Sequence, residues 1–160
     1  MFSLQPPLGY LLTWTTYGTR LHGDERGSVD LAHNKRYTAK LAPNPVRESD
    51  SRRLLVQEPF VMDDRHRPIV DVAIRDHCSI RGWMLHAVNV RTNHVHVVVT
   101  ANSHSPETAM KQFKDWGTRR MIAAGLIGHD RKVWTDHGST PWLNTTEQFE
   151  AAIEYVLHGQ

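Results

Sequence analysis

Three short stretches of the chain combine apolar, β-branched and aromatic residues in a way that predicts β-strands. The first covers residues 9–18. Residues 83–90 and 94–100 are separated only by the polar residues 91–93, which predicts a β-hairpin. One or two further short strands are expected within residues 131–144.

Three other segments carry apolar residues at helical spacing. The first helix should end at Gly82 and bury a face made of Ile69, Val72, Ala73, Asp76, Ile80 and Trp83. The second is expected over residues 105–125, with Ser105 as its N-cap. The last should begin with a capping box formed by Asn144 and Glu147. Its buried stripe should consist of Phe149, Ala152, Ile153 and Val156.

The remaining long segment, residues 19–67, is polar and interrupted by glycine and proline. It predicts a surface excursion, with Pro45 able to start a short helix. The order of elements is strand, excursion, helix, hairpin, helix, strand and helix. This order indicates an α+β, ferredoxin-like (RRM-like) antiparallel sheet with helices packed on it. Because no internal repeat is present, a single domain over residues 1–160 is expected.

Composition limits the class of protein. The 160 residues are 39% hydrophobic and 22% charged, which is typical of a folded chain rather than a disordered one. No apolar run is long enough to span a membrane, and the first residues do not resemble a secretory signal. The one cysteine, Cys78, cannot form an internal disulfide, so a cytoplasmic location is expected. A net charge of +2 permits nucleic-acid binding without indicating it.

Two of the 11 histidines suggest a metal site. His94 and His96 lie two residues apart on a predicted strand, so both should face the same side of the sheet. The valines that alternate with them should face the other side. Two imidazoles on one rigid strand form half of a metal site. The same spacing also fits two histidines that only hydrogen-bond to their neighbours.

Other histidine motifs fit the chain less well. A zinc site of the H-x-H-x-D-H type would need Asp and His where Val98 and Val99 stand. A phosphoesterase with two H-x-S/T motifs could use the motifs that begin at His77 and His137. However, His77 lies in a predicted helix, whereas that chemistry requires a strand.

A resemblance to a known family combines these features. The sequence "NHVHVVV", which follows one predicted strand and precedes a helix, resembles the histidine–hydrophobic–histidine (HUH) motif of single-tyrosine transposases. These include small insertion-sequence transposases and REP-associated tyrosine transposases. The final helix, "FEAAIEYVLHGQ", supplies a tyrosine, Tyr155, at the matching place. The resemblance covers residues 9–18 and most of residues 69–160.

The resemblance implies a reaction and a cofactor. His94 and His96 would bind a divalent metal, Mg²⁺ or Mn²⁺, and Tyr155 would attack the DNA phosphodiester. The product would be a 5′-phosphotyrosine and a free 3′-hydroxyl, which allows a strand to be rejoined elsewhere. The family often takes a third ligand from a Gln or Asn one turn after the tyrosine. Here Gly159 stands at that place, so His158 or Gln160 is expected to substitute.

DNA contacts are expected from the second helix. Four basic residues of this helix could neutralise phosphates: Lys111, Lys114, Arg119 and Arg120. Phe113 and Trp116 between them could stack on bases, although burial against the sheet is the better expectation for aromatic residues. Further candidate surface residues are Arg52, Arg53, Arg65, Arg67, Trp134 and His137. Asp24 and Glu25 fit a solvated turn better than a metal site.

The sequence therefore predicts a metal-dependent transposase that nicks and rejoins single-stranded or hairpin DNA. Two alternatives remain: a non-catalytic DNA-binding protein of the same fold, and a phosphoesterase that uses water instead of Tyr155. The resemblance is compatible with both a homodimer and a monomer, because relatives of the insertion-sequence type share sites in dimers and the REP-associated kind can act alone. It does not give the DNA sequence that is recognised.

Overall fold

The computed structural model describes residues 5–19 and 56–159, and these form an antiparallel sheet with three helices. The sheet has the order β2-β3-β1-β4. Its strands are β1 (Gly9–Thr15), β2 (Met84–Val90), β3 (His94–Thr100) and β4 (Trp142–Leu143). The helices are α2 (His66–Arg81), α3 (Pro106–Ala123) and α4 (Thr146–His158). The short helix expected at Pro45 lies outside the described residues.

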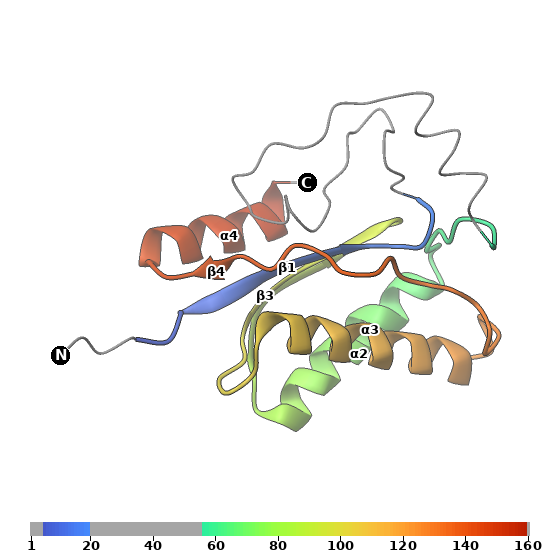
Figure 1. The fold of residues 1–160 in the computed structure, drawn as a ribbon, viewed down its shortest axis with the longest axis horizontal. Helices are drawn as coiled ribbons and strands as arrows, with labels where there is room; N and C mark the ends of the chain where they lie inside the picture. Colours follow the sequence, from blue (N-terminus) through green and yellow to red (C-terminus); the bar gives the residue numbers. More distant parts are fainter. Residues whose placement is uncertain (1–4, 20–55, 160) are drawn as a thin grey trace.

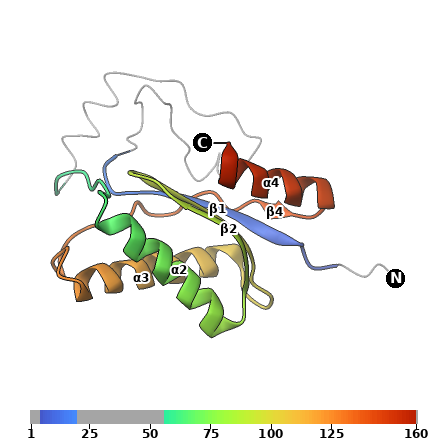
Figure 2. The same ribbon diagram turned by 180° about the vertical axis from the view of Figure 1, so that it is seen from behind.

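The helices cover both faces of the sheet (Figures 1 and 2). α2 connects β1 to β2 and α3 connects β3 to β4, and the two helices pack together on one face. α4 packs on the other face, against β2 and β3. This arrangement confirms the predicted ferredoxin-like α+β class, with α4 as an addition to the basic pattern. Within the described residues, no helix is both long and apolar enough to span a membrane.

The face covered by α2 and α3 holds the larger core. Val95, Val97 and Val99 of β3 point into it and are fully buried. Trp14 of β1 stacks on Phe113 of α3, with 6.2 Å between ring centroids. A smaller core lies under α4 and contains Leu11, Ala87, Val98, Leu143, Ala152 and Val156. The strict alternation of β3 thus sends its valines to both cores and its histidines to the α4 face only.

Local sequence signals predicted the start of α3 and the end of α2 correctly, and the start of α4 to within one residue. The Ser105 hydroxyl accepts a hydrogen bond from the Thr108 amide, as expected of an N-cap. Gly82 ends α2 with a φ of 71°, a conformation that favours glycine. The capping box of α4 was predicted one residue too early, because it is formed by Thr145 and Gln148. Both pairs satisfy the capping pattern, so the sequence alone could not choose between them.

The buried face of α2 differs from the prediction. Val72 is 47% exposed and Ile80 is 70% exposed, although both were expected in the core. The residues that α2 buries are His66, Val70, Ala73, Ile74, His77 and Cys78. Ala73 and Trp83 are buried as predicted. The prediction omitted Val70 and Ile74 as well as the two histidines, so the observed face is rotated about the helix axis relative to the predicted one.

The predicted surface excursion ends earlier than expected. Phe60 is 4% exposed and Met62 is fully buried, so both belong to the larger core. Their amides donate to the carbonyls of Tyr17 and Thr92, at 2.8 Å and 2.7 Å. Phe60 and Met62 are therefore part of the domain interior rather than of a surface excursion, whereas Val61 between them is exposed.

Candidate active site

The histidine pair lies at the beginning of β3, on the face of the sheet that α4 covers. His94 and His96 share that face, with 4.8 Å between their ring centroids, as their spacing predicted. His96 is 5% exposed and His94 is half-buried. In the antiparallel register their partners on β1 are Thr15 and Thr13. The rigid centre of the sheet therefore fixes the separation of the two imidazoles.

Each imidazole is oriented by a hydrogen bond at Nδ1. The Nδ1 of His94 lies 2.8 Å from Oδ1 of Asn93, to which it can only donate. The Nδ1 of His96 lies 2.8 Å from Oγ1 of Thr13 on the neighbouring strand. Partners of this kind fix the ring orientation of histidines that bind metals through the other nitrogen, Nε2. The donor arrangement therefore fits a metal held by the two Nε2 atoms.

Tyr155 reaches the pair from α4. Ala152 and Val156 are fully buried under this helix, and Phe149 and Ile153 pack beside them, as the predicted stripe required. Tyr155 lies off this stripe and is 43% exposed. Its ring centroid is 5.4 Å from that of His96, with 73° between the ring planes. A phenol and two imidazoles thus converge on one side of the sheet.

A third metal ligand beside the histidine pair stays a prediction. Among residues 5–19 and 56–159, no group of three or more His, Cys, Asp or Glu side chains is placed to hold a metal ion. His158 is exposed at the end of α4. Gln160, as well as Asp24 and Glu25, lies outside the described residues. His94 and His96 are therefore the two described residues that could hold a metal ion together.

The basic residues of α3 lie on the opposite side of the sheet from the histidine pair (Figure 1). Lys111 pairs with Asp115 at 2.9 Å, and Arg120 pairs with Asp76 at 3.1 Å. The guanidinium of Arg119 lies 5.4 Å from the ring centroid of Trp116. These residues belong to a separate surface, and their binding of DNA stays a prediction.

The side chain of Lys114 connects α3 to the segment that precedes β4. Its ammonium donates to the carbonyls of Thr135 and His137, at 2.9 Å and 2.8 Å. Burial lowers the pKa of this ammonium to about 8. The Nε1 of Trp134 donates to the Lys114 carbonyl at 3.0 Å, so Trp134 also faces α3 rather than the histidine pair. Phe113 is fully buried, as expected of an aromatic residue packed on the sheet.

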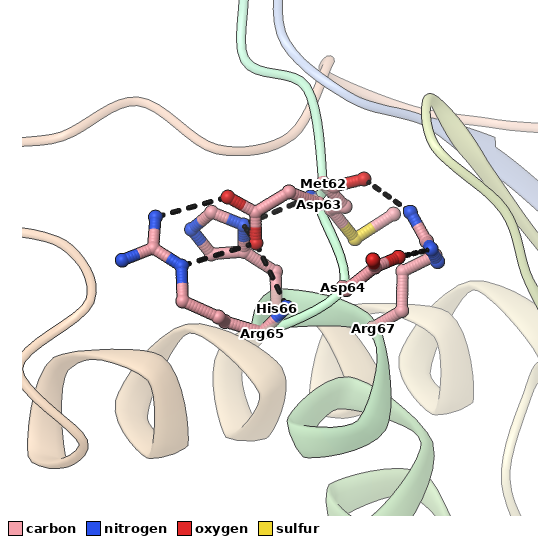
Figure 3. A network of polar contacts seen from close by, with 6 residues as sticks. All are labelled: Met62, Asp63, Asp64, Arg65, His66 and Arg67. Atoms are coloured by element: carbon pink, nitrogen blue, oxygen red, sulfur yellow. Dashed lines mark hydrogen bonds and ion pairs between the residues drawn. The ribbon is translucent and has the colours of Figure 1, made fainter.

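The two described arginines from the predicted basic surface are paired locally (Figure 3). Arg65 forms an ion pair with Asp63 at 2.9 Å. Hydrogen bonds from Arg65 hold the pKa of Asp63 well below its usual value. Arg67 pairs with Asp64 and donates to the Met62 carbonyl at 2.8 Å. These arginines organise the start of α2, and Arg52 and Arg53 lie outside the described residues.

The two H-x-S motifs do not come together on strands. His77 lies in α2, as predicted, and is 3% exposed. Its ring packs against those of Trp83, Phe113 and Trp116, and its Nε2 lies 2.6 Å from Oε1 of Gln112. His137 is exposed in the segment between α3 and β4. The geometry of a two-histidine phosphoesterase is therefore absent from these two motifs.

The sequence reading missed the residues that orient the histidines. Asn93 directly precedes His94, so its local role could have been considered from the sequence. Thr13 lies 83 positions from His96, and only the strand register brings the two together.

Comparisons with known proteins show the family of this chain. A family model described as "Transposase IS200 like" matches residues 56–142, which is more than half of the chain and includes both histidines. The chain belongs to the IS200-like transposase family. No curated protein sequence gives a significant match.

Two solved structures share the fold. One is described as a "putative transposase" from Deinococcus radiodurans R1, with a TM-score of 0.53 and 18% identity over 100% of this chain and 95% of that one. The other is a REP-associated tyrosine transposase bound to a REP hairpin, with a TM-score of 0.52 and 12% identity over 98% of this chain and 67% of that one. At these identities the similarity supports the fold.

Proposed function

We propose that this protein cleaves and rejoins single-stranded DNA, with Tyr155 as the nucleophile and His94 and His96 as metal ligands. The observation that carries the proposal is the convergence of the three rings, 4.8 Å and 5.4 Å apart between neighbouring centroids. Membership of a transposase family makes DNA the expected substrate. Hairpin DNA is the form proposed here, since the REP-associated neighbour was solved with a hairpin.

The chain provides two parts of the chemistry. His94 and His96 would hold Mg²⁺ or Mn²⁺ through Nε2, because Asn93 and Thr13 occupy the Nδ1 side of the two rings. A bound divalent ion would polarise the scissile phosphate and stabilise its negative charge. Tyr155 is partly exposed, so a strand lying along the α4 face could reach its hydroxyl.

The reaction that follows is a transfer of the phosphoryl group to the phenol. The Tyr155 oxygen forms a bond to phosphorus while its proton passes to water. The bond from phosphorus to the 3′ oxygen breaks, and this oxygen takes up a proton. The strand end is left as a 5′-phosphotyrosine. Attack by a 3′-hydroxyl of another strand reverses these steps, so rejoining requires no external energy source.

An adduct assay tests this proposal. The protein is incubated with labelled single-stranded and hairpin DNA in Mn²⁺ and analysed on a denaturing gel. The expected result is a band shifted by the mass of the protein, which is lost in Tyr155→Phe. Tyr10→Phe is the matched control, because Tyr10 is buried and its hydroxyl donates to the His104 carbonyl. An adduct that survives Tyr155→Phe would remove Tyr155 from the mechanism.

The two alternatives predict other results in the same assay. A non-catalytic DNA-binding protein would shift the DNA on a native gel and form no covalent band. A phosphoesterase that uses water would produce shorter DNA without an adduct. The arrangement of Tyr155 beside His96 favours the transposase reaction over both.

A further inference from the structure

We infer that Asn89 is a positioning residue that holds the last turn of α4, and with it Tyr155, beside His96. This inference rests on the proposed function, because it assigns a role in the reaction of Tyr155. It also makes a structural statement about α4 that can be measured without DNA.

The register of the sheet places Asn89 next to the histidine pair. Asn89 of β2 is the direct partner of His96 on β3, and Thr13 of β1 is its partner on the other side. Residues directly opposite each other on neighbouring strands have side chains on the same face. Asn89, His96 and Thr13 therefore form one row across three strands, on the face that α4 covers.

The side chain of Asn89 reaches from this row to the helix. Its Nδ2 donates to the carbonyl oxygen of Val156 at 3.0 Å. Val156 directly follows Tyr155 and lies in the last turn of α4, which ends at His158. Carbonyls in the last turn of a helix have no amide partner within the helix. The Asn89 amide supplies such a partner, from the strand that borders His96.

Other contacts of α4 with described residues hold the beginning and the middle of the helix. The capping box of Thr145 and Gln148 and the contact between Phe149 and His86, 4.7 Å between ring centroids, both hold the beginning of the helix. Ala152 and Val156 are fully buried, and the hydrogen bond from Asn89 adds a directional contact to this packing in the last turn. Tyr155 is 43% exposed, so its own packing only partly determines its position.

A pair of variants separates positioning from general stability. Asn89→Ala removes the bond at the end of α4, and Gln148→Ala removes side-chain hydrogen bonds at its beginning. Each variant loses hydrogen bonds between a side chain and the backbone at one end of α4. Asn89→Ala loses the bond from Nδ2 to the Val156 carbonyl, and Gln148→Ala loses the bonds that Oε1 of Gln148 accepts from the amides of Asn144 and Thr145. Asn89→Gln keeps an amide donor one methylene further out and serves as the conservative variant.

Three measurements are made on each full-length variant. The first is the single-turnover rate of adduct formation at saturating DNA, with DNA affinity measured separately. The second is Mn²⁺ affinity. The third is hydrogen exchange of the amides in the last turn of α4. For Asn89→Ala we expect an adduct rate lowered about fivefold, the size of effect that loss of one hydrogen bond gives. We also expect faster exchange in the last turn and unchanged Mn²⁺ and DNA affinity.

The controls define the result that overturns the inference. Gln148→Ala should speed exchange only in the first turn and leave the adduct rate as in the wild type, and Asn89→Gln should recover part of the rate. If exchange in the last turn is the same in Asn89→Ala and the wild type, Asn89 does not hold the turn and the inference is wrong. Faster exchange with an unchanged adduct rate equally removes its role in the reaction. If the wild type forms no adduct, the proposed function fails and so does the catalytic part of the inference, while exchange still decides whether Asn89 holds the turn.

Discussion

A histidine is buried on each face of the sheet, to nearly the same extent, but the groups that surround the two side chains differ. His77 is 3% exposed and His96 is 5% exposed. His77 lies among the rings of Trp83, Phe113 and Trp116, and burial lowers its pKa. His96 lies between a second imidazole, a threonine hydroxyl and a phenol.

This difference shows that burial alone does not mark a functional histidine. An aromatic environment favours the neutral imidazole as a packing group. A row of nitrogen and oxygen atoms next to a partly exposed nucleophile favours binding of a cation and a phosphate. The face covered by α2 and α3 therefore stabilises the protein, and the α4 face is where we place its chemistry.

Alanine substitutions of His96 and of His77 should show the largest difference between the two faces. His96→Ala should lower the rate of adduct formation by more than about a hundredfold, because loss of a metal ligand should have a larger effect than loss of a residue that only hydrogen-bonds to a ligand. It should leave the fold intact. His77→Ala should instead lower the free energy of unfolding by about 2–3 kcal/mol, as for other large cavities, while adduct formation at low temperature stays near the wild-type rate.

The measurements are adduct formation on a denaturing gel and urea unfolding followed by circular dichroism. A His96→Ala protein that forms adduct at the wild-type rate would contradict the assignment of the α4 face. An inactive but stably folded His77→Ala protein would contradict the division between the faces.

Truncation of the two cores should also have unequal effects. Phe113→Ala empties a fully buried site in the larger core and should cost about 3–5 kcal/mol of unfolding free energy. Val156→Ala removes two methyl groups from the smaller core under α4 and should cost about 1–2 kcal/mol. Urea unfolding measures both values. Equal costs would show that α4 contributes as much to stability as the opposite face does.

The hydroxyl of Thr13 should tune metal binding. Thr13→Val preserves the shape of the side chain and removes the bond to Nδ1 of His96, so Mn²⁺ affinity should fall about ten- to a hundredfold. Thr15→Val is the matched control, because the Thr15 hydroxyl bonds to Thr135 instead of a histidine. Titration calorimetry with Mn²⁺ checks both variants. The same loss of affinity in both would mean that strand packing, and not the hydrogen bond, determines metal binding.

The smallest expected effect is the dependence of stability on pH. Burial lowers the pKa of both His77 and His86 below the ordinary value of 6.5. Below pH 6.5 the unfolded chain therefore binds more protons at these sites than the folded chain does, and stability should fall as the pH is lowered. Above this pH their contribution is fully present. Unfolding in urea between pH 5 and 8 should show a shallower fall in His77→Phe and in His86→Phe, and an unchanged slope in both would contradict this reading.

Much of the fold could be predicted from the sequence because its signals are local. Alternation along residues 94–100 placed His94 and His96 on one face and Val95, Val97 and Val99 on the other. The ring contact of the histidines and the burial of these valines in the larger core confirm this. Ser105 and Gly82 set helix ends through bonds within a few residues. The prediction of the buried face of α2 was right for Ala73 and wrong for Val72 and Ile80, because α2 docks on the sheet with a neighbouring face that includes two histidines.

The site depended on contacts that no local pattern contains. The pair His94 and His96 follows from strand periodicity, but the approach of Tyr155 to His96 depends on how α4 lies on the sheet. Thr13 reaches His96 through strand register, over 83 positions of sequence, and Asn89 reaches Val156 through the docking of α4, over 67 positions. The sequence by itself thus determined which strand residues alternate, and it identified Ser105 and Gly82 at two helix ends. Only the tertiary structure decided which of them meet, because register and helix docking arise from packing of the whole sheet.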